Sequence, residues 1–498
     1  MQDLLELSHI VTKRKLRSVE LFSTSEDGEP KSKIQQFYEL LVSGEFDNDD
    51  QVAQYFYGKG KSNSSYQKLR GTLKSRLINA LFLIDLKQAS YGNRQRAYYE
   101  SYREWAATKI LFGKQARTAA ISQCRKLVKI ARQYEFTELL VDILHTLRLY
   151  YGTIEGDHKK YQQYNQAFKE AQKQWHLETE VEEEYLELSI GFVNAKATRH
   201  EVREQAERAF KTVAPIMENH TAYQIHLCGR LIEVSQFTSV NDYADALDVC
   251  ERAIAFFAAK DYEASIPLQI FHYQKLICHL QLYQIDEAFA ASDICETFLE
   301  EGTFNWFKLH EVRLQLYMVT KAYAKAARLV SDVLGHESFA NLPDNISETW
   351  KISEAYLYFI QQAGHLPVDT VSDFRTARFL NDIEVFTKDK RGMNIHLIVL
   401  EVLLYLVEKN YDRLIDRVEA IDKYRTRYLK EDGLERTNHF LRMLLQLPKN
   451  AFEREKVVEK ASADYAALQD IPIALANQAH EIEIVPYEYL WEMVLETL

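Results

Sequence analysis

The residues best suited to chemistry in this sequence are basic side chains between positions 59 and 132. This window contains 17 Lys and Arg residues and only three acidic ones, Asp85, Glu100 and Glu104. The whole chain has 61 basic and 73 acidic side chains and a net charge of -12, so a window of +14 leaves -26 on the remainder. This asymmetry indicates an anionic partner at one end of the chain and does not bear on the fold.

Five basic residues follow one another at spacings of three, eight, four and three: Lys114, Arg117, Arg125, Lys129 and Arg132. On a helix that begins near Lys114 they share one face, which only Ile121 interrupts. Like charges at such spacing cost about a few tenths of a kcal/mol per pair in an isolated helix, so we expect something anionic against this face. Acidic helices after Glu135, or a neighbouring copy packed head to tail, are alternatives to an external ligand.

Further basic residues lie upstream of this stretch. Arg96, Tyr99 and Arg103 share a helix face, where cations alternating with an aromatic ring can stack bases and contact phosphates. A Ser-rich helix start at residues 62–65 can accept a phosphate on its free N–H groups. The remaining candidates for an anionic partner are the following: Lys59, Lys61, Lys68, Arg70 and Lys74. We weigh three hypotheses for this window: nucleic-acid binding, neutralisation within the molecule or between subunits, and an acidic protein partner.

Motifs of common enzymes are missing from the sequence. It contains no GxxxxGK[ST], GxGxxG, HExxH or GxSxG pattern and no Cys-rich metal spacing. His272, Cys278 and His279 are grouped, but two histidines on one helix do not make a metal site, so we expect them to pack. The acidic run from Glu180 to Glu187 predicts a solvated helix face. We therefore predict a non-enzymatic protein without a catalytic residue, cofactor or metal.

The elements that position these residues are predicted to be helices. The chain has 16 Gly and 8 Pro among 498 residues, against about 35 and about 25 in average usage. Residues 1–30 are expected to form an N-terminal arm and linker. Residues 31–90 predict a small three-helix bundle, with turns at Gly44 and Gly58 and a stripe from Leu69 to Ile84 on its third helix. In outline this order also matches a helix-turn-helix reader.

From residue 91 onward the pattern becomes one of helix pairs. One residue near the start of each second helix, which we call a repeat mark, recurs at intervals of 44, 42, 40, 42 and 38 residues. A further repeat mark, Leu414, lies 88 residues after the sixth. A period near 40 residues predicts an α-solenoid, whose units stack because none can bury its apolar face alone. The first six marks are Ala120, Tyr164, Ala206, Ala246, Ala288 and Ala326.

The segments NDYADALDVCERAIAFF, YQIDEAFAASDICETFL and AYAKAARLVSDVL resemble second helices of tetratricopeptide (TPR) repeats. In that family a small residue recurs seven positions after the first, as Ala253 follows Ala246 and Cys295 follows Ala288. Val333 after Ala326 departs from the pattern, and the period exceeds the family's 34 residues. The resemblance implies an all-α, right-handed superhelical array of TPR-like helix pairs over residues 91–470. Some bacterial regulators join a small helical domain to such repeats, which is an analogy of fold only.

The end of the chain and its cysteines complete the prediction. Residues 471–498 are expected to cap the last repeat. The five cysteines form no CxxC pair and predict buried free thiols in a reducing cytoplasm. We expect no secretory signal, because no apolar stretch follows the first basic residues, and no membrane span.

Together these features predict a cytoplasmic scaffold or adaptor that binds a protein or peptide partner. The alternative is a nucleic-acid-associated regulator, in which residues 59–132 bind the phosphate backbone and the repeats recruit a partner.

Overall fold

The computed structural model describes residues 1–13, 32–46, 48–84, 86, 92–193, 199–371, 373–382, 393–428, 435–471, 473 and 483–498. Helices dominate these residues and no β-strand occurs among them, so the predicted all-α class is confirmed. The chain forms two compact units, Met1–Gln172 and Lys173–Leu498, which we call unit 1 and unit 2. Each unit is described by itself.

Unit 1 begins with a bundle in which α3 (Lys33–Val42), α4 (Asp49–Tyr57) and α5 (Ser64–Leu81) occupy the three predicted segments. The expected arm differs, because its first residues form α1 (Gln2–Lys13), which packs against α3 and α5. Leu4 and Val11 lie seven residues apart on one face of α1, and both are fully buried in the core of the bundle. The linker predicted after Lys13 lies outside the described residues.

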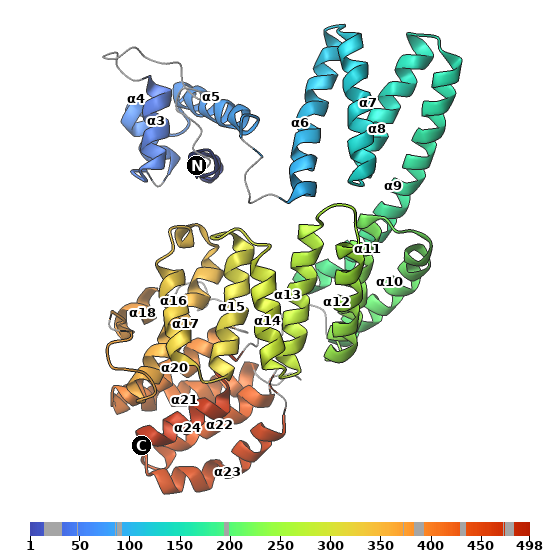
Figure 1. Cartoon of the computed structure of the whole chain (residues 1–498). Helices are drawn as coiled ribbons and strands as arrows, with labels where there is room; N and C mark the ends of the chain where they lie inside the picture. The colour runs from blue at the N-terminus through green and yellow to red at the C-terminus, as the bar shows by residue number, and fades with distance from the viewer. Residues whose placement is uncertain are drawn as a thin grey trace. The chain divides into compact units, whose positions relative to one another are not determined.

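The rest of unit 1 consists of longer helices. Each of α6 (Asn93–Gly113), α7 (Arg117–Gln133) and α8 (Thr137–Thr153) packs on the next (Figure 1). Their shared core contains Leu127, Ile143 and Tyr151. The next helix, α9 (His158–Val193), has 36 residues. The boundary between the units falls inside it, so its residues up to Gln172 belong to unit 1 and those from Lys173 onward to unit 2.

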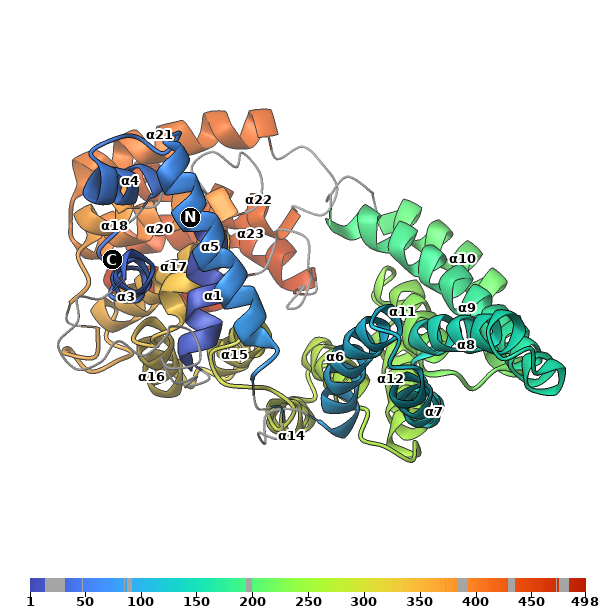
Figure 2. The same ribbon diagram turned by 90° about the horizontal axis from the view of Figure 1, so that it is seen from above.

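Unit 2 continues with helices that pack mainly on their neighbours in the chain, as Figure 2 shows for α14–α16, which lie side by side. Its largest core extends from Trp306 to Val494. The helices after α9 are α10 (Arg199–Asn219), α11 (Tyr223–Thr238), α12 (Tyr243–Ala258), α13 (Ser265–Gln281), α14 (Ile285–Glu296), α15 (Phe304–Val319), α16 (Tyr323–Leu334), η1 (Phe339–Asn341), α17 (Asp344–Gln362), α18 (Thr376–Asp382), α20 (Met393–Val407), α21 (Tyr411–Tyr428), α22 (Glu435–Lys449), α23 (Arg454–Asp470) and α24 (Tyr487–Thr497).

One turn geometry recurs between helices in both units. A residue other than glycine has a positive φ of 55–61° two positions before the next helix begins. The following residue donates its backbone N–H to the carbonyl five positions earlier, as Ala322 does to Tyr317 at 2.8 Å, which caps the carbonyl end of the first helix. The left-handed residues in these turns are Gln115, Glu135, Asn241, Tyr283, Lys321 and Lys409.

Most of the predicted repeat marks lie at the same position in their helices and are fully buried. Ala120, Ala246, Ala288, Ala326 and Leu414 each stand three residues after the first residue of α7, α12, α14, α16 and α21. All five are 0% exposed, as is Ala206 in α10. Tyr164 in α9 is the exception, since it is only partly buried. A small side chain at this position allows close approach of the preceding helix.

The last helix contacts segments far upstream. Besides packing on α20 and α23, α24 places the Tyr489 hydroxyl 3.2 Å from the carbonyl oxygen of Val319, to which it donates. Lys321 and Glu492 form an ion pair at 3.1 Å. The predicted cap therefore also covers the turn between α15 and α16. Residues 472 and 474–482 of the predicted cap lie outside the described part of the chain.

Candidate functional site

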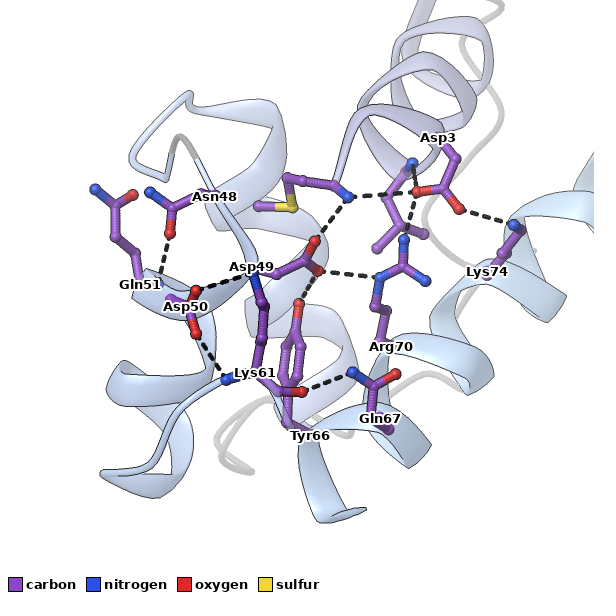
Figure 3. Close-up of polar contacts among 12 residues, drawn as sticks. Asp3, Asn48, Asp49, Asp50, Gln51, Lys61, Tyr66, Gln67, Arg70 and Lys74 are labelled. Atoms are coloured by element: carbon purple, nitrogen blue, oxygen red, sulfur yellow. Dashed lines mark hydrogen bonds and ion pairs between the residues drawn. The ribbon is translucent and has the colours of Figure 1, made fainter. Parts of the chain in front are cut away.

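Three of the predicted basic residues in the bundle have internal carboxylate partners (Figure 3). Arg70 Nε lies 3.0 Å from Asp49 Oδ1, and Lys74 Nζ lies 2.7 Å from Asp3 Oδ2. Lys61 pairs with Asp50 at 3.4 Å. For Lys61, Arg70 and Lys74 the structure thus favours the hypothesis of neutralisation within the molecule, by acidic residues that lie outside the basic window.

Proton affinities agree with this neutralisation. The hydrogen bond from Lys74, together with the charges of Arg70 and Lys74, lowers the pKa of Asp3 despite its partial burial. Burial raises the pKa of Tyr66, and the hydrogen bond that its hydroxyl donates to Asp49 raises this pKa further. The Met1 amino group also donates to Asp49, at 2.8 Å. The sequence did not single out Asp3, Asp49 and Tyr66 as members of this network, although an acidic residue in the first turn of α1 and of α4 was a usable signal.

At the predicted phosphate site, the start of α5, the backbone N–H groups already have a partner in a side chain of the same segment. The Asn63 side chain accepts hydrogen bonds from the backbone N–H groups of Ser65 and Tyr66, at 3.0 and 3.1 Å. These are the N–H groups that a phosphate would require. Lys59 and Lys68 remain exposed, and neither forms an ion pair within the described residues.

The α6 residues are separated into local pairs. Arg96 donates to the Asn93 side chain at 2.9 Å, and Arg103 donates to the carbonyl oxygen of Phe82 at 3.1 Å. Tyr99 is exposed and accepts a hydrogen bond from Gln95. The three predicted residues thus do not form one stacked array with each other.

Arg94, which was not among the predicted residues, makes a cation–aromatic contact between α6 and Phe136. Arg94 lies over the Phe136 ring, 5.0 Å from its centroid, and donates to the carbonyl oxygen of Tyr134 at 3.0 Å. This arginine therefore joins α6 to the turn that precedes α8.

The basic stripe around α7 is shorter than predicted. Gln115 ends α6 in a left-handed turn and α7 begins at Arg117, so Lys114 belongs to that turn and not to the helix. Arg117 lies on α7 but is rotated from the last three cations by about 60–120° at 3.6 residues per turn. Arg125, Lys129 and Arg132 are exposed and share a sector of about 60°. We call these three residues the α7 cationic face.

The α7 cationic face lacks carboxylate partners. Arg125 donates to the Tyr151 hydroxyl at 2.8 Å, which raises the pKa of the guanidinium. Among the described residues, no carboxylate forms an ion pair with Arg125, Lys129 or Arg132. The carboxylates after Glu135 have other partners: Glu138 with Tyr102, Asp142 with Trp105 and Lys109, Glu155 with Tyr150, and Asp157 with Lys160. Neutralisation of the stripe by these helices is therefore contradicted within unit 1.

The histidine and cysteine group on α13 packs in the interior. Cys278 is fully buried, and the His279 ring nitrogen lies 2.7 Å from the Gln284 side-chain oxygen. His272 stacks on Phe298. In the part of the chain that the structure describes, no set of three His, Cys, Asp or Glu residues is arranged to bind a metal ion.

Two general findings concern the whole chain. None of the described helices combines the length and apolar character needed to cross a membrane. No protein-family model matches the sequence, and no curated protein matches it significantly.

Proposed function

We propose that this chain is a non-enzymatic, cytoplasmic helical-repeat scaffold that binds an acidic protein partner through the α7 cationic face. The helix pairs are proposed to coil as a TPR-like, right-handed array over residues 91–470. The recurring left-handed turns and the buried marks at one position of α7, α12, α14, α16 and α21 support this repeat arrangement. Such arrays present extended surfaces for protein partners.

The observation that supports an acidic partner is the lack of a carboxylate partner for the α7 cationic face within the described residues. Within the described residues, all three cations of this face are exposed and none pairs with a carboxylate. In the bundle, by contrast, Lys61, Arg70 and Lys74 each have a carboxylate partner. Three cations on one short helix face match a limited acidic surface better than an extended phosphate backbone, which needs many contacts.

Charge reversal tests the proposed function. In the variant Arg125→Glu, Lys129→Glu and Arg132→Glu, binding of a fluorescent poly-L-glutamate probe should weaken by about tenfold or more at low salt. A matched control reverses Lys169, Lys211 and Lys325, which are also exposed. Equal affinity of the wild type and the α7 variant for the probe would refute the proposal.

Nucleic-acid binding is the second candidate, since the same three cations can contact phosphates. Fluorescence anisotropy with single- and double-stranded oligonucleotides separates the two. If the α7 cationic face contacts duplex DNA, the log-log salt slope should be about -3, and reversal of the three charges should flatten it. Oligonucleotide binding stronger than polyglutamate binding at near-physiological salt would replace the acidic-protein proposal with a regulator.

A further inference from the structure

The part of α9 that belongs to unit 2 has one face whose carboxylates form no ion pair in the described part of the chain. Glu183 and Glu187 are exposed and Glu180 is half-buried, and within the described residues none of them forms an ion pair. Leu186 and Ile190 border these carboxylates and are 53% and 59% exposed. Partial burial and the neighbouring Glu187, Glu183 and Glu180 raise the pKa of Glu184, which indicates uncompensated negative charge.

This face is complementary in spacing to the α7 cationic face. Arg125, Lys129 and Arg132 are separated by four and three residues, and Glu187, Glu183 and Glu180 by four and three in the reverse direction. At 1.5 Å per residue each set extends over about 10.5 Å, and each lies within a sector of about 60°. Two antiparallel helices can therefore place three opposite charges in register, as the following pairs: Arg125 with Glu187, Lys129 with Glu183, and Arg132 with Glu180.

We propose that the acidic partner of the α7 cationic face is a second copy of this chain, whose α9 presents Glu180, Glu183 and Glu187. This inference rests on the proposed function and names its partner. The contact is heterologous, because it joins different surfaces of two copies, and it leaves one free surface of each kind at the ends of any open assembly. Burial of Leu186 and Ile190 beside the ion pairs contributes to the contact.

Ion pairs at an exposed surface are weak and screened by salt. The association is therefore expected at low ionic strength and high protein concentration. Sedimentation velocity of the full chain should show a sedimentation coefficient that increases with concentration at low salt and does not at high salt. A wild type that remains monomeric over the whole concentration range at low salt overturns the inference.

Two triple variants define the surfaces. The first changes Arg125, Lys129 and Arg132 to Glu, and the second changes Glu180, Glu183 and Glu187 to Lys. Each alone should be monomeric, because like charges then face each other. An equimolar mixture should associate again, because the native α9 of the first variant meets the native α7 of the second. Circular dichroism establishes that both variants fold, so renewed association in the mixture cannot be due to misfolding of either.

A control variant changes Glu218, Glu287 and Glu337 to Lys, which alters charge by the same amount at exposed residues elsewhere in unit 2. It should retain the wild-type association. If the α9 variant associates like the wild type, or if the mixture stays monomeric, the inference is wrong.

Polyglutamate binding distinguishes the two proposals. If the chain is monomeric but binds polyglutamate through Arg125, Lys129 and Arg132, only the second-copy inference fails. If it neither associates nor binds the probe, both fail.

Discussion

The two units of the chain differ in the sign of their net charge and in how deeply their ion pairs are buried. Unit 1 has 27 basic and 20 acidic residues, a net charge of +7, whereas unit 2 has 34 basic and 53 acidic residues, a net charge of -19. In unit 1 the ion pairs of the bundle are partly exposed, and Arg70 and Asp49 are each 23% exposed. The α7 cationic face is left unpaired.

Unit 2 places an ion-pair network in its interior. Arg436, 9% exposed, lies 2.6 Å from Glu483 and 2.7 Å from Glu488, and it donates to the carbonyl oxygens of Leu468 and Ile471. It thereby joins α22, the end of α23 and the start of α24. Net charge therefore does not show where charges stabilise a fold. The more acidic unit buries Arg436, whereas the basic unit leaves the α7 cationic face exposed.

The largest expected effect comes from breaking the buried network of unit 2. Arg436→Met leaves Glu483 and Glu488 without their partner and should destabilise unit 2 by about 3–5 kcal/mol. Urea unfolding followed by tryptophan fluorescence measures this loss. Arg442→Met is the matched control, because Arg442 is 46% exposed and makes one ion pair at 3.4 Å. Equal midpoints for the two variants would contradict the role given to Arg436.

The corresponding change in unit 1 should have a smaller effect. Asp49→Asn weakens the hydrogen bonds from Arg70 and Tyr66, and we expect a loss of about 1–3 kcal/mol. Burial alone would raise the pKa of Asp49, but hydrogen bonds from the Met1 amino group and Tyr66 bring it below its usual value. Its contribution is thus present above about pH 4 and lost as pH falls further.

The measurement for Asp49 is thermal unfolding as a function of pH. The difference between the wild type and Asp49→Asn should shrink in acid, and Asp261→Asn, which changes an exposed carboxylate, serves as the control. A difference that stays constant down to pH 3 would argue against an ionised Asp49 in the network.

Acid should act on unit 2 through a buried histidine. Burial lowers the pKa of His310, whose ring nitrogen lies 2.9 Å from the carbonyl oxygen of Trp306. The unfolded chain therefore binds the proton more readily, and stability should fall as pH decreases below about 6.5, by at most about 1.4 kcal/mol per pH unit. His310→Gln should reduce this slope in pH-dependent urea unfolding, whereas His176→Gln, at an exposed position, should not.

The smallest expected effect is a gain in stability at a turn. Lys409 has φ of 57° in the turn before α21, a conformation that costs a side chain about 1 kcal/mol relative to glycine. Lys409→Gly should stabilise unit 2 by about 0.5–1 kcal/mol, while Lys409→Ala should change little. Gln115→Gly tests the same geometry in unit 1. A loss of stability in both glycine variants would show that entropy outweighs strain.

Much of the fold could be predicted because helix signals were local. Gly44 and Gly58 mark the ends of α3 and α4, and the Leu69 stripe identifies α5. The recurring turns were harder to predict from the sequence. Their left-handed position, where glycine usually indicates a helix end, is occupied by other residues such as Lys321. The contact between α24 and the α15–α16 turn joins residues about 170 positions apart, and no local pattern encodes it.

The candidate site was predictable only in part. Spacing alone brought Arg125, Lys129 and Arg132 onto one face, because three residues of a single helix keep their register. It failed for Arg70 and Lys74, because their partners Asp3 and Asp49 belong to other helices of the bundle. Tertiary contacts determine which cations remain without a carboxylate partner, and counting charges along the sequence does not reveal these contacts.

The position of α24 has a consequence for biosynthesis. Repeat arrays gain stability from contacts between neighbours and can fold as the chain emerges from the ribosome. The turn at Val319 and Lys321, however, meets its partners Tyr489 and Glu492 only after almost all of unit 2 has been translated. Unit 1 can thus complete its contacts early in synthesis, whereas the turn between α15 and α16 and the core that packs on α24 are completed only once the last helix has been made.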